Sequence, residues 1–440
     1  MVVLPAMVAD WLRRPGSAPP GEALLERRAV DFLALAGRLG APLGDKETRR
    51  LRSEAASALA DGRFADADKA LAQAELHSIG GASDLSTLPV AQRLRIGENR
   101  ADRAGISFLR TTPEAYREAA GRYGEASALI GLADVDRSRA VALAQAKALA
   151  RLSEDFGGRD GYDAAVTVLH RLLEGLDSLE DTVAFAGAQD ALAATLEALA
   201  EIAGMEDLRV EALARCRAGV EHLHRDEAPL LWHALTVRFG RLAVTIGESR
   251  EDDALLEEAV TALATVLAVW DRNRDEARWL EAEHMISRAR AALGGRRNDL
   301  ALLERAFNGF NRVAKAVDRA REPLRWAELQ DQMGGVLVAM GERYRDPVVF
   351  EEAIAVFAAA LEERRRESVP LLWATSSANQ ALPMMRLAER RKDAALARQA
   401  LTQIAVAIEA MRSAGFAANA KHLEARLIKA GALVEALNKA

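Results

Sequence analysis

PLRWAELQDQMGGVLVAMGERYRDPVVFEEAIAVFAAALEE, residues 323 to 363, is the stretch that decides the fold. Apolar residues recur through it with helical spacing on both sides of a short polar segment. The stretch therefore predicts two amphipathic helices joined by a loop. One such pair cannot bury its apolar face alone, so it needs a stacked neighbour.

The same pattern returns along the chain at a fixed interval. Its first helix opens on a tryptophan, and each step between these tryptophans (279−232, 326−279 and 373−326) is 47 residues: Trp232, Trp279, Trp326 and Trp373. Its second helix carries an alanine and, four positions later, a larger residue: Ala165 and Leu169, Ala212 and Cys216, Ala259 and Leu263, Ala306 and Phe310, Ala353 and Phe357, Ala400 and Ile404. Self-similarity at one period predicts an all-α solenoid of stacked helical hairpins.

Small residues are expected where the helices cross. An alanine at each fixed position lets the second helix approach its partner, because a larger side chain would hold the two backbones apart. Gly240 and Gly334 lie in the middle of first helices, where glycine costs about 1 kcal/mol relative to alanine. That cost predicts a close approach between helices at both points.

Four segments are predicted along the chain. Residues 1–44 form an N-terminal arm and helix, in which Trp11 and Leu12 anchor the arm, and residues 45–133 form irregular hairpins. Residues 134–413 form the regular 47-residue array, and residues 414–440 form a C-terminal capping helix with a polar outer side.

Composition narrows the possible partners. Fifty-nine basic residues against 65 acidic ones give a net charge of −6, whereas nucleic-acid binders carry a basic excess, so no nucleic-acid partner is expected. Cys216 is the only cysteine, which rules out a disulfide within the chain, and its register predicts a buried apolar residue. The N-terminus makes a poor signal peptide, and no apolar run reaches the ~20 residues of a membrane span, so we expect a cytoplasmic protein.

The sequence contains no recognisable catalytic or cofactor motif. Phosphate-binding, dinucleotide-binding, zinc-protease and nucleophile-elbow patterns are all missing, so neither enzyme activity nor a cofactor is expected. His222, His224 and His233 are the densest histidine group, but side chains two apart on a helix diverge. We expect them to face solvent or lie at helix ends, with no metal site. Two arginine runs at helix ends, residues 364–366 and 390–391, are interpreted as a solvated face or as complements of the helix dipole, with binding of an anion or acidic partner as the alternative.

The pattern resembles tetratricopeptide repeats in a lengthened bacterial form, clearly over residues 134–413 and loosely over 45–130. The small residue at the eighth family position matches Gly240, Gly334 and Ala381. The small residue that opens the family's second helix matches Ala259, Ala306, Ala353 and Ala400, and the larger apolar residue four positions later matches Leu263, Phe310, Phe357 and Ile404. PLLW at 229–232 and 370–373 and PLRW at 323–326 resemble the start of the longer variant. The period of 47 departs from the usual repeat of about 34 residues. HEAT and armadillo arrays have comparable periods, but the glycine and alanine placement separates this chain from them.

The resemblance implies a right-handed superhelix whose first helices line a concave groove that holds peptides or partner proteins. Projecting the inward-facing family positions onto this chain gives a mixed polar groove: Val237, Arg241, His284, Arg288, Glu328, Asp331 and Asn379. Such a groove suits a peptide that carries both charges, with salt-sensitive binding.

The first functional hypothesis is a non-catalytic scaffold that binds a peptide or partner protein in this groove. The alternative is a sensor or regulatory module that controls a separate catalytic domain or partner enzyme. An all-helical toroid enzyme would need paired inward carboxylates in register, and none is found, while RNA binding would require strongly salt-dependent affinity. Self-association into a homo-oligomer is a further possibility, because solenoids with apolar ends can stack.

Overall fold

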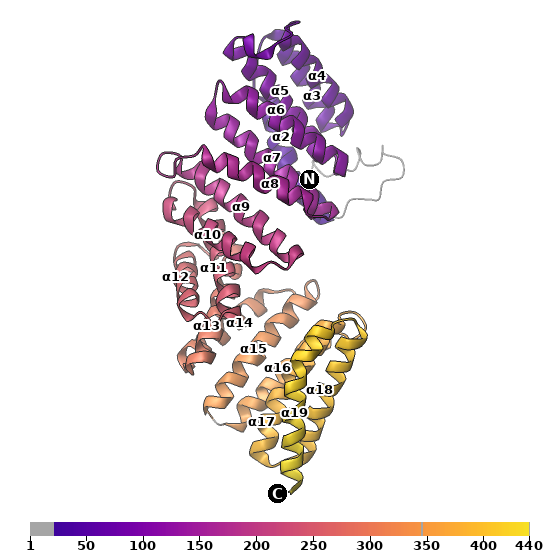
Figure 1. The fold of residues 1–440 in the computed structure, drawn as a ribbon, viewed down its shortest axis with the longest axis vertical. Coiled ribbons are helices and arrows are strands. Elements are labelled where there is room, and N and C mark those ends of the chain that lie inside the picture. The colour runs from indigo at the N-terminus through magenta and orange to yellow at the C-terminus, as the bar shows by residue number, and fades with distance from the viewer. Residues whose placement is uncertain (1–21, 345, 440) are drawn as a thin grey trace. The chain divides into compact units, whose positions relative to one another are not determined.

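The computed structural model describes residues 22–344 and 346–439, which are helical throughout and contain no strand (Figure 1). The chain divides into two compact units, one ending at Leu235 and the other starting at Thr236. The first unit contains α2 (Glu22–Gly40), α3 (Lys46–Ala60), α4 (Phe64–Ile79), the short 3-10 helix η1 (Leu85–Thr87), α5 (Val90–Leu109), α6 (Pro113–Gly131), α7 (Val135–Phe156), α8 (Asp160–Glu174), α9 (Thr182–Ala203), α10 (Glu206–His222) and the start of α11 (Pro229–Ser249).

The second unit continues the same order with the rest of α11 and then eight further helices. They are α12 (Asp253–Val269), α13 (Glu276–Arg297), α14 (Leu300–Ala316), α15 (Pro323–Tyr344), α16 (Pro347–Glu363), α17 (Pro370–Arg391), α18 (Ala394–Ser413) and α19 (Ala417–Lys439). From α3 on, odd-numbered helices are the first helices of hairpins and even-numbered ones the second, and each helix packs on the next from α3 to α10 and from α12 to α19. The predicted all-α fold of stacked helical hairpins is confirmed, and α19 packs on α18 as the terminal helix.

Two predictions about the organisation of the chain are not tested by the structure. The arm predicted for residues 1–20, with Trp11 and Leu12, lies outside the described residues. The four-segment division of the chain stays a prediction. Among the helices described, none is long and apolar enough to span a bilayer.

A repeated aspartate starts the second helices. Asp252, Asp299, Asp346 and Asp393 recur every 47 residues, and each side chain accepts a hydrogen bond from a backbone N–H in the first turn. Such caps satisfy donors that a helix start leaves free. One residue before three of these caps the backbone is left-handed, with φ of 56° at Glu251, 51° at Asn298 and 54° at Lys392. Together the two features fix where each hairpin turns.

The periodic alanines lie between helices, as predicted. All of Ala165, Ala212, Ala259, Ala306, Ala353 and Ala400 are 0% exposed, and the residues four positions later are exposed by 1% or less. The close approach predicted at the mid-helix glycines is also confirmed. A Cβ added at Gly240 would lie 2.6 Å from the Leu263 side chain, and one at Gly334 would lie 2.8 Å from the Phe357 ring.

The periodic tryptophans Trp279, Trp326 and Trp373 each carry an arginine on the ring face. The guanidinium carbons of Arg272, Arg319 and Arg366 lie 5.1, 4.2 and 5.5 Å from the ring centroids of Trp279, Trp326 and Trp373, respectively. Every arginine precedes its tryptophan by seven residues (279−272, 326−319, 373−366). These cation–π contacts tie the loop between hairpins to the next first helix.

Polar side chains at the ends of first helices hold successive hairpins in register. Arg297 and Tyr344 donate to Glu257 and Glu304 at 2.5 and 2.7 Å, and Arg391 pairs with Glu351, all at the same register of the repeat. The interpretation of residues 364–366 and 390–391 as solvated or dipole-complementing helix ends is wrong for Arg364, which is 5% exposed and contacts Asp331 on α15 and Ser376 on α17. Arg365, Arg366 and Arg391 are exposed. Arg390 and Arg391 lie in the last turn of α17, and Arg390 donates to the Gly341 carbonyl on the preceding hairpin at 3.1 Å.

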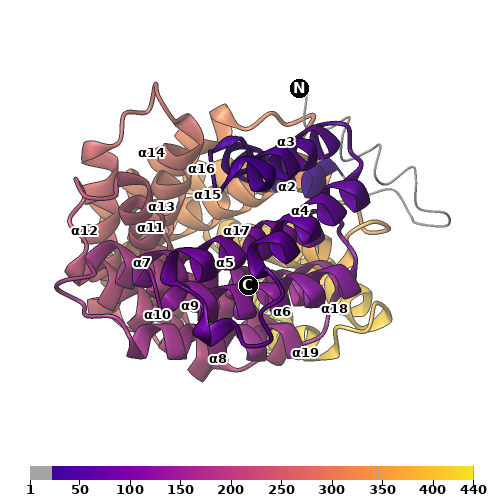
Figure 2. The same cartoon turned by 90° about the horizontal axis from the view of Figure 1, so that it is seen from above.

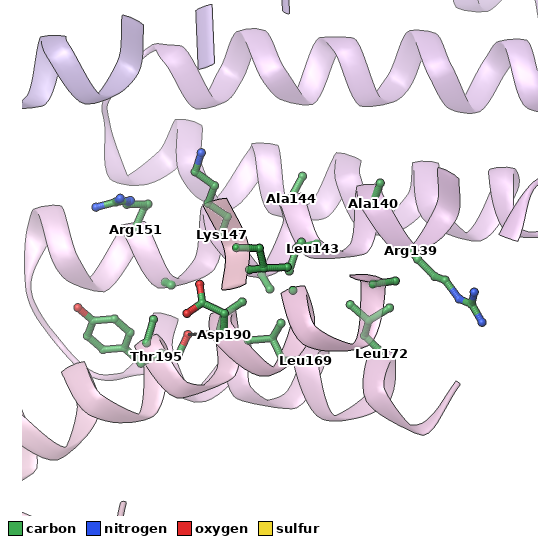
Figure 3. Close-up of a pocket in the computed structure, with 18 of the residues that line it drawn as sticks. Arg139, Ala140, Leu143, Ala144, Lys147, Arg151, Leu169, Leu172, Asp190 and Thr195 are labelled. Carbon is green, nitrogen blue, oxygen red and sulfur yellow. Dashed lines mark hydrogen bonds between the residues drawn. The ribbon is translucent and has the colours of Figure 1, made fainter. Parts of the chain in front are cut away.

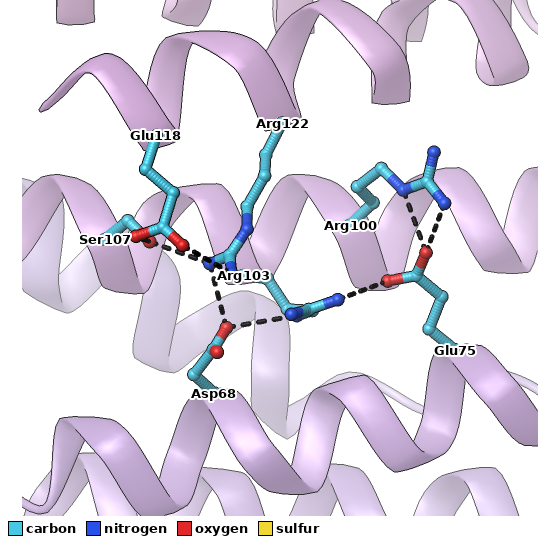
Figure 4. Close-up of polar contacts among 7 residues, drawn as sticks. All are labelled: Asp68, Glu75, Arg100, Arg103, Ser107, Glu118 and Arg122. Carbon is cyan, nitrogen blue, oxygen red and sulfur yellow. Dashed lines mark hydrogen bonds and ion pairs between the residues drawn. The ribbon is translucent and has the colours of Figure 1, made fainter. Parts of the chain in front are cut away.

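The hairpins near the N-terminus are joined by a separate polar network (Figure 4). Arg103 on α5 donates to Asp68 at 3.0 Å and to Glu75 at 2.9 Å, both on α4. Arg122 on α6 donates to the same Asp68 oxygen at 3.0 Å and to Ser107 at 2.8 Å. Because carboxylate and guanidinium groups satisfy one another across α4, α5 and α6, the network stabilises the packing of these helices.

Candidate functional site

Two of the groove residues predicted from the family pattern, His284 and Glu328, form one cluster with Gln332 on α13 and α15. His284 Nε2 donates to Gln332 Oε1 at 2.8 Å, and Gln332 Nε2 donates to Glu328 Oε1 at 3.2 Å. The His284 ring also packs edge-on against Phe310. Burial lowers the pKa of His284, and the hydrogen bond to Gln332 opposes that shift.

A second cluster joins α15 to α17. Asn379 Nδ2 donates to Asp331 Oδ2 at 3.2 Å, and the guanidinium of Arg364 lies 3.7 Å from the other carboxylate oxygen. Arg426 on α19 donates to Asn379 Oδ1 at 3.3 Å. Burial raises the pKa of Asp331, while Ser376, Arg364 and Asn379 oppose the shift. Successive first helices are therefore bonded to each other through these positions.

The other predicted groove residues are not part of either cluster. Val237 on α11 is 3% exposed and belongs to the core, while Arg241 is half-buried. Arg288 on α13 donates to Glu248 on α11 at 2.6 Å. The seven residues thus lie on α11, α13, α15 and α17, and most of their polar atoms are used between helices. Their role in partner binding stays a prediction.

A large open site lies instead in the first unit, between α7 and α9 over α8. It is a cavity of about 1170 Å³ (Figure 3). The labelled side chains of Leu143, Leu169 and Asp190 turn toward the space between their helices. Leu231 from the first turn of α11 completes the lining. We call this space the α7–α9 cleft.

Small residues make the walls of the cleft. Gly187, Ala191, Ala194 and Ala198 line it from α9, at spacings of four, three and four residues that place them on one helical face. Ala140, Ala144 and Ala150 line it from α7. Most of these residues are only half-buried, so no other described part of the chain covers the cleft.

The cleft occupies the register of the groove predicted from the sequence. Val237 minus 47 is Asp190, Arg241 minus 47 is Ala194, and Asn379 minus 188 (four steps of 47) is Ala191. All three of these earlier positions line the cleft. The projected helix face is therefore the lining face of α9, where Ala191 and Ala194 stand at the register of Asn379 and Arg288, while Asp190 keeps a carboxylate at the register of Asp331. The signal in the sequence was the alanine-rich stretch 184–198, which has no large residue at these positions.

Charged residues around the cleft are mostly paired with the protein itself. Arg139 donates to Asp181 at 2.7 Å and to the Gly175 carbonyl at 2.8 Å. Lys147 pairs with Asp31 of α2, and Arg151 pairs with Glu154. The interior therefore remains apolar between polar ends, which suits the binding of an apolar surface rather than acid–base chemistry.

Histidine and cysteine chemistry gives no competing site. His222, at the end of α10, donates from Nδ1 to the Ala218 carbonyl at 2.9 Å, as a helix-end histidine should. His233 is 2% exposed, so the prediction of a solvent-facing or helix-end side chain is wrong there, because α11 turns it into the packed interior. Cys216 is buried, as predicted. Within residues 22–344 and 346–439 no group of histidine, cysteine and carboxylate side chains is placed to hold a metal ion.

Comparison with known proteins gives distant structural similarities alone. No family model matches the sequence, and no curated protein matches it either. One similar solved structure is a Rap protein complexed with competence and sporulation factor, with 11% identity and a TM-score of 0.30 over 94% of this chain and 99% of that one. Another is a circular tandem repeat protein with novel repeat topology, with 15% identity and a TM-score of 0.26 over 99% and 96%.

Similarity at this level places no ligand or partner on this chain. The chain is a helical repeat protein by its own helices and their packing. Its assignment to the tetratricopeptide repeats stays a prediction, since no family model matches.

Proposed function

We propose that this protein is a non-catalytic interaction scaffold, and that its α7–α9 cleft receives an amphipathic helix of a partner protein. The observation that carries the proposal is the cleft itself, an uncovered apolar space between two first helices. Its volume of about 1170 Å³ exceeds the usual range of small-molecule sites, roughly 300–1,000 Å³.

The walls support a helix as the guest. Helices pack at 8–10 Å between axes when small residues lie at the contact. Gly187, Ala191 and Ala194 present such residues along α9, while Ala140 and Ala144 do so along α7. An amphipathic helix laid between them would bury its apolar face in the cleft and keep its polar face in water, which is a common mode of peptide recognition.

The charge balance supports a protein partner over a nucleic acid. The chain has a net charge of −6, and the cations at the cleft already pair with Asp31, Asp181 and Glu154. Counterion release from phosphates, which drives nucleic-acid binding, needs exposed basic groups.

A matched pair of tryptophan variants tests the proposal. Gly187→Trp fills the cleft, and the nearest side-chain atom to a Cβ added there is Leu231 Cδ2 at 3.9 Å, so the backbone has room for the change. Ala234→Trp places the same side chain at the same register one repeat later (234−187 = 47), at an exposed position outside the lining.

The probe is a fluorescent peptide with the sequence of residues 22–40, an amphipathic helix of this chain. We expect saturable binding, with one peptide per chain, to the wild type and to Ala234→Trp, and loss of binding in Gly187→Trp. Equal binding to both variants, or no binding to the wild type, would contradict the proposed function.

A further inference from the structure

The helix α2 shows how a helix lies on the first-helix face of this unit. It packs against α3 and α5, which are both first helices (Figure 2). Its Asp31 pairs with Lys147 of α7, and Lys147 also lines the α7–α9 cleft. The N-terminal half of α2 therefore contacts α7, and α7 also forms one wall of the cleft. The cleft continues the first-helix face on which α2 lies.

One arginine anchors α2. Arg28 is 1% exposed, and its guanidinium donates to the Tyr116 hydroxyl at 2.7 Å and to Asp155 at 3.0 Å. The group also lies over the Phe108 ring, 4.1 Å from the centroid. Burial alone would lower the pKa of Arg28, but Tyr116 and the two nearby aspartates outweigh it and leave that pKa raised. The charge is thus buried together with the partners that it needs.

Apolar residues follow the anchor on the same face of α2. Phe32, Leu35 and Leu39 come four, seven and eleven residues after Arg28, a spacing that keeps all of them on one side of a helix. These three side chains are buried in one core with residues of α3, α4 and α5. A buried cation followed by an apolar stripe is therefore how a helix is held on this face.

The α7–α9 cleft repeats the groups that hold Arg28. Tyr116 opens the second helix α6, and Tyr162 opens the second helix α8, 46 residues later (162−116). Asp155 lies near the end of the following first helix, α7, and Glu201 lies near the end of α9, again 46 residues later (201−155). Both Tyr162 and Glu201 line the cleft.

Glu201 is one of several charged groups near Tyr162. Burial raises the pKa of Tyr162, and the charges of Glu154, Asp155 and Glu201 add to the shift while Arg151 opposes it. Tyr162 and Glu201 thus line the same cleft, whereas Tyr116 donates directly to Asp155 at 2.8 Å beside Arg28. The α2 side of this arrangement has Arg28, whereas the cation that acts on Tyr162 is Arg151 of α7, which already pairs with Glu154.

We propose that the partner helix carries an arginine or lysine whose cationic end lies between Tyr162 and Glu201. Apolar residues of the partner helix follow this cation on the same helical face, as Phe32, Leu35 and Leu39 follow Arg28 on α2. This inference rests on the proposed function and adds the chemistry that selects the guest. A cation there gains charge-assisted hydrogen bonds with the buried Tyr162 and the exposed Glu201, while the apolar stripe fills the cleft.

Peptides that differ at one residue test the selection. The probe is the peptide of residues 22–40, compared with the same peptide carrying Arg28→Gln or Arg27→Gln. The two changes remove the same charge from adjacent positions, which point about 100° apart on a helix. We expect Arg28→Gln to weaken binding to the full-length protein by about tenfold or more, the loss of a hydrogen-bonded charge, and Arg27→Gln by less than about twofold.

A charge swap locates the effect. Glu201→Arg should weaken binding of the wild-type peptide, and an Arg28→Glu peptide should recover affinity for that variant alone. If all peptides bind the wild type equally and Gly187→Trp still abolishes binding, the proposed function stands and this inference is overturned. If no peptide binds, both are overturned.

Other occupants would also overturn the inference, each with its own result. A wild-type dimer seen by light scattering that Gly187→Trp dissociates would make a second copy of the chain the occupant. Peptide binding that appears only after removal of residues 1–21 would make the chain's own N-terminal segment the occupant.

Discussion

Adjacent glycines in α15 allow a sharp test of how closely the hairpins stack. A Cβ added at Gly334 would lie 2.8 Å from Phe357 Cε2 and Cζ, whereas one added at Gly335 would have no atom within 4 Å. Gly334→Ala and Gly335→Ala therefore make the same chemical change on the same helix, one against a buried ring and one toward solvent.

The expected effects have opposite signs. Replacing glycine by alanine in a helix interior stabilises by about 1 kcal/mol, and this gain applies at both positions. Overpacking a well-filled core costs about 1–3 kcal/mol, and this cost applies at Gly334 alone. Gly335→Ala should thus raise the free energy of unfolding by about 1 kcal/mol, and Gly334→Ala should lower it by as much as about 2 kcal/mol.

Urea denaturation followed by circular dichroism measures both variants. Repeat arrays need not unfold in one step, so the whole transition of each variant is compared with the wild type. Phe357→Leu replaces the ring that Gly334 faces with a smaller side chain. It should reduce the difference in unfolding free energy between the two alanine variants, because the effects of substitutions at contacting sites are not additive. If Gly334→Ala proves as stable as Gly335→Ala, the close approach of α15 and α16 is refuted.

Three further changes test other contacts. Arg28→Ala leaves Asp155 and Tyr116 buried without their cation and should cost about 3–5 kcal/mol in unfolding free energy; a cost below 1 kcal/mol would contradict the anchor. Asp68→Ala removes the acceptor that Arg103 and Arg122 share, and denaturation should show a loss of about 1–3 kcal/mol, whereas no loss would make the network incidental. Hydrogen bonds from Arg296 and Arg297 lower the pKa of Asp253, so its contribution to stability is present above the unfolded pKa of about 4 and is lost as pH falls through the folded pKa. Asp253→Asn should therefore lower the denaturation midpoint at pH 7, with the difference from wild type closing below about pH 4; a difference independent of pH would contradict this pairing.

The fold follows from the sequence because its determinants are local and repeated. The alanines at 47-residue intervals, their larger partners four residues later and Gly334 all lie at helix crossings, where size alone decides which residue fits. Spacing in the sequence is enough to find such positions. The burial of Arg364 could not be predicted in this way. It depends on how one hairpin is offset on the next, and the sequence of a single helix does not determine that offset.

The candidate site was harder to find for a physical reason. The groove predicted from the sequence consists mainly of polar residues, and those on α13, α15 and α17 bond to one another across successive helices. The α7–α9 cleft is defined by small residues such as Gly187 and Ala191. In the sequence they resemble ordinary helix-packing positions, but none of the helices in residues 22–344 and 346–439 covers them. The repeat of Tyr116 and Asp155 at Tyr162 and Glu201 gains meaning only once Arg28 is seen between the first pair.

Photo-cross-linking tests the central claim most directly, because it reports where a helix lies without changing the protein. The peptide of residues 22–40 would carry photo-leucine in place of Leu35, and mass spectrometry would map the cross-linked residues of the wild-type chain. The account predicts cross-links in residues 139–154 of α7 and 183–201 of α9, lost when unlabelled peptide competes. Cross-links that fall instead beyond Thr236, or that survive competition, would contradict it.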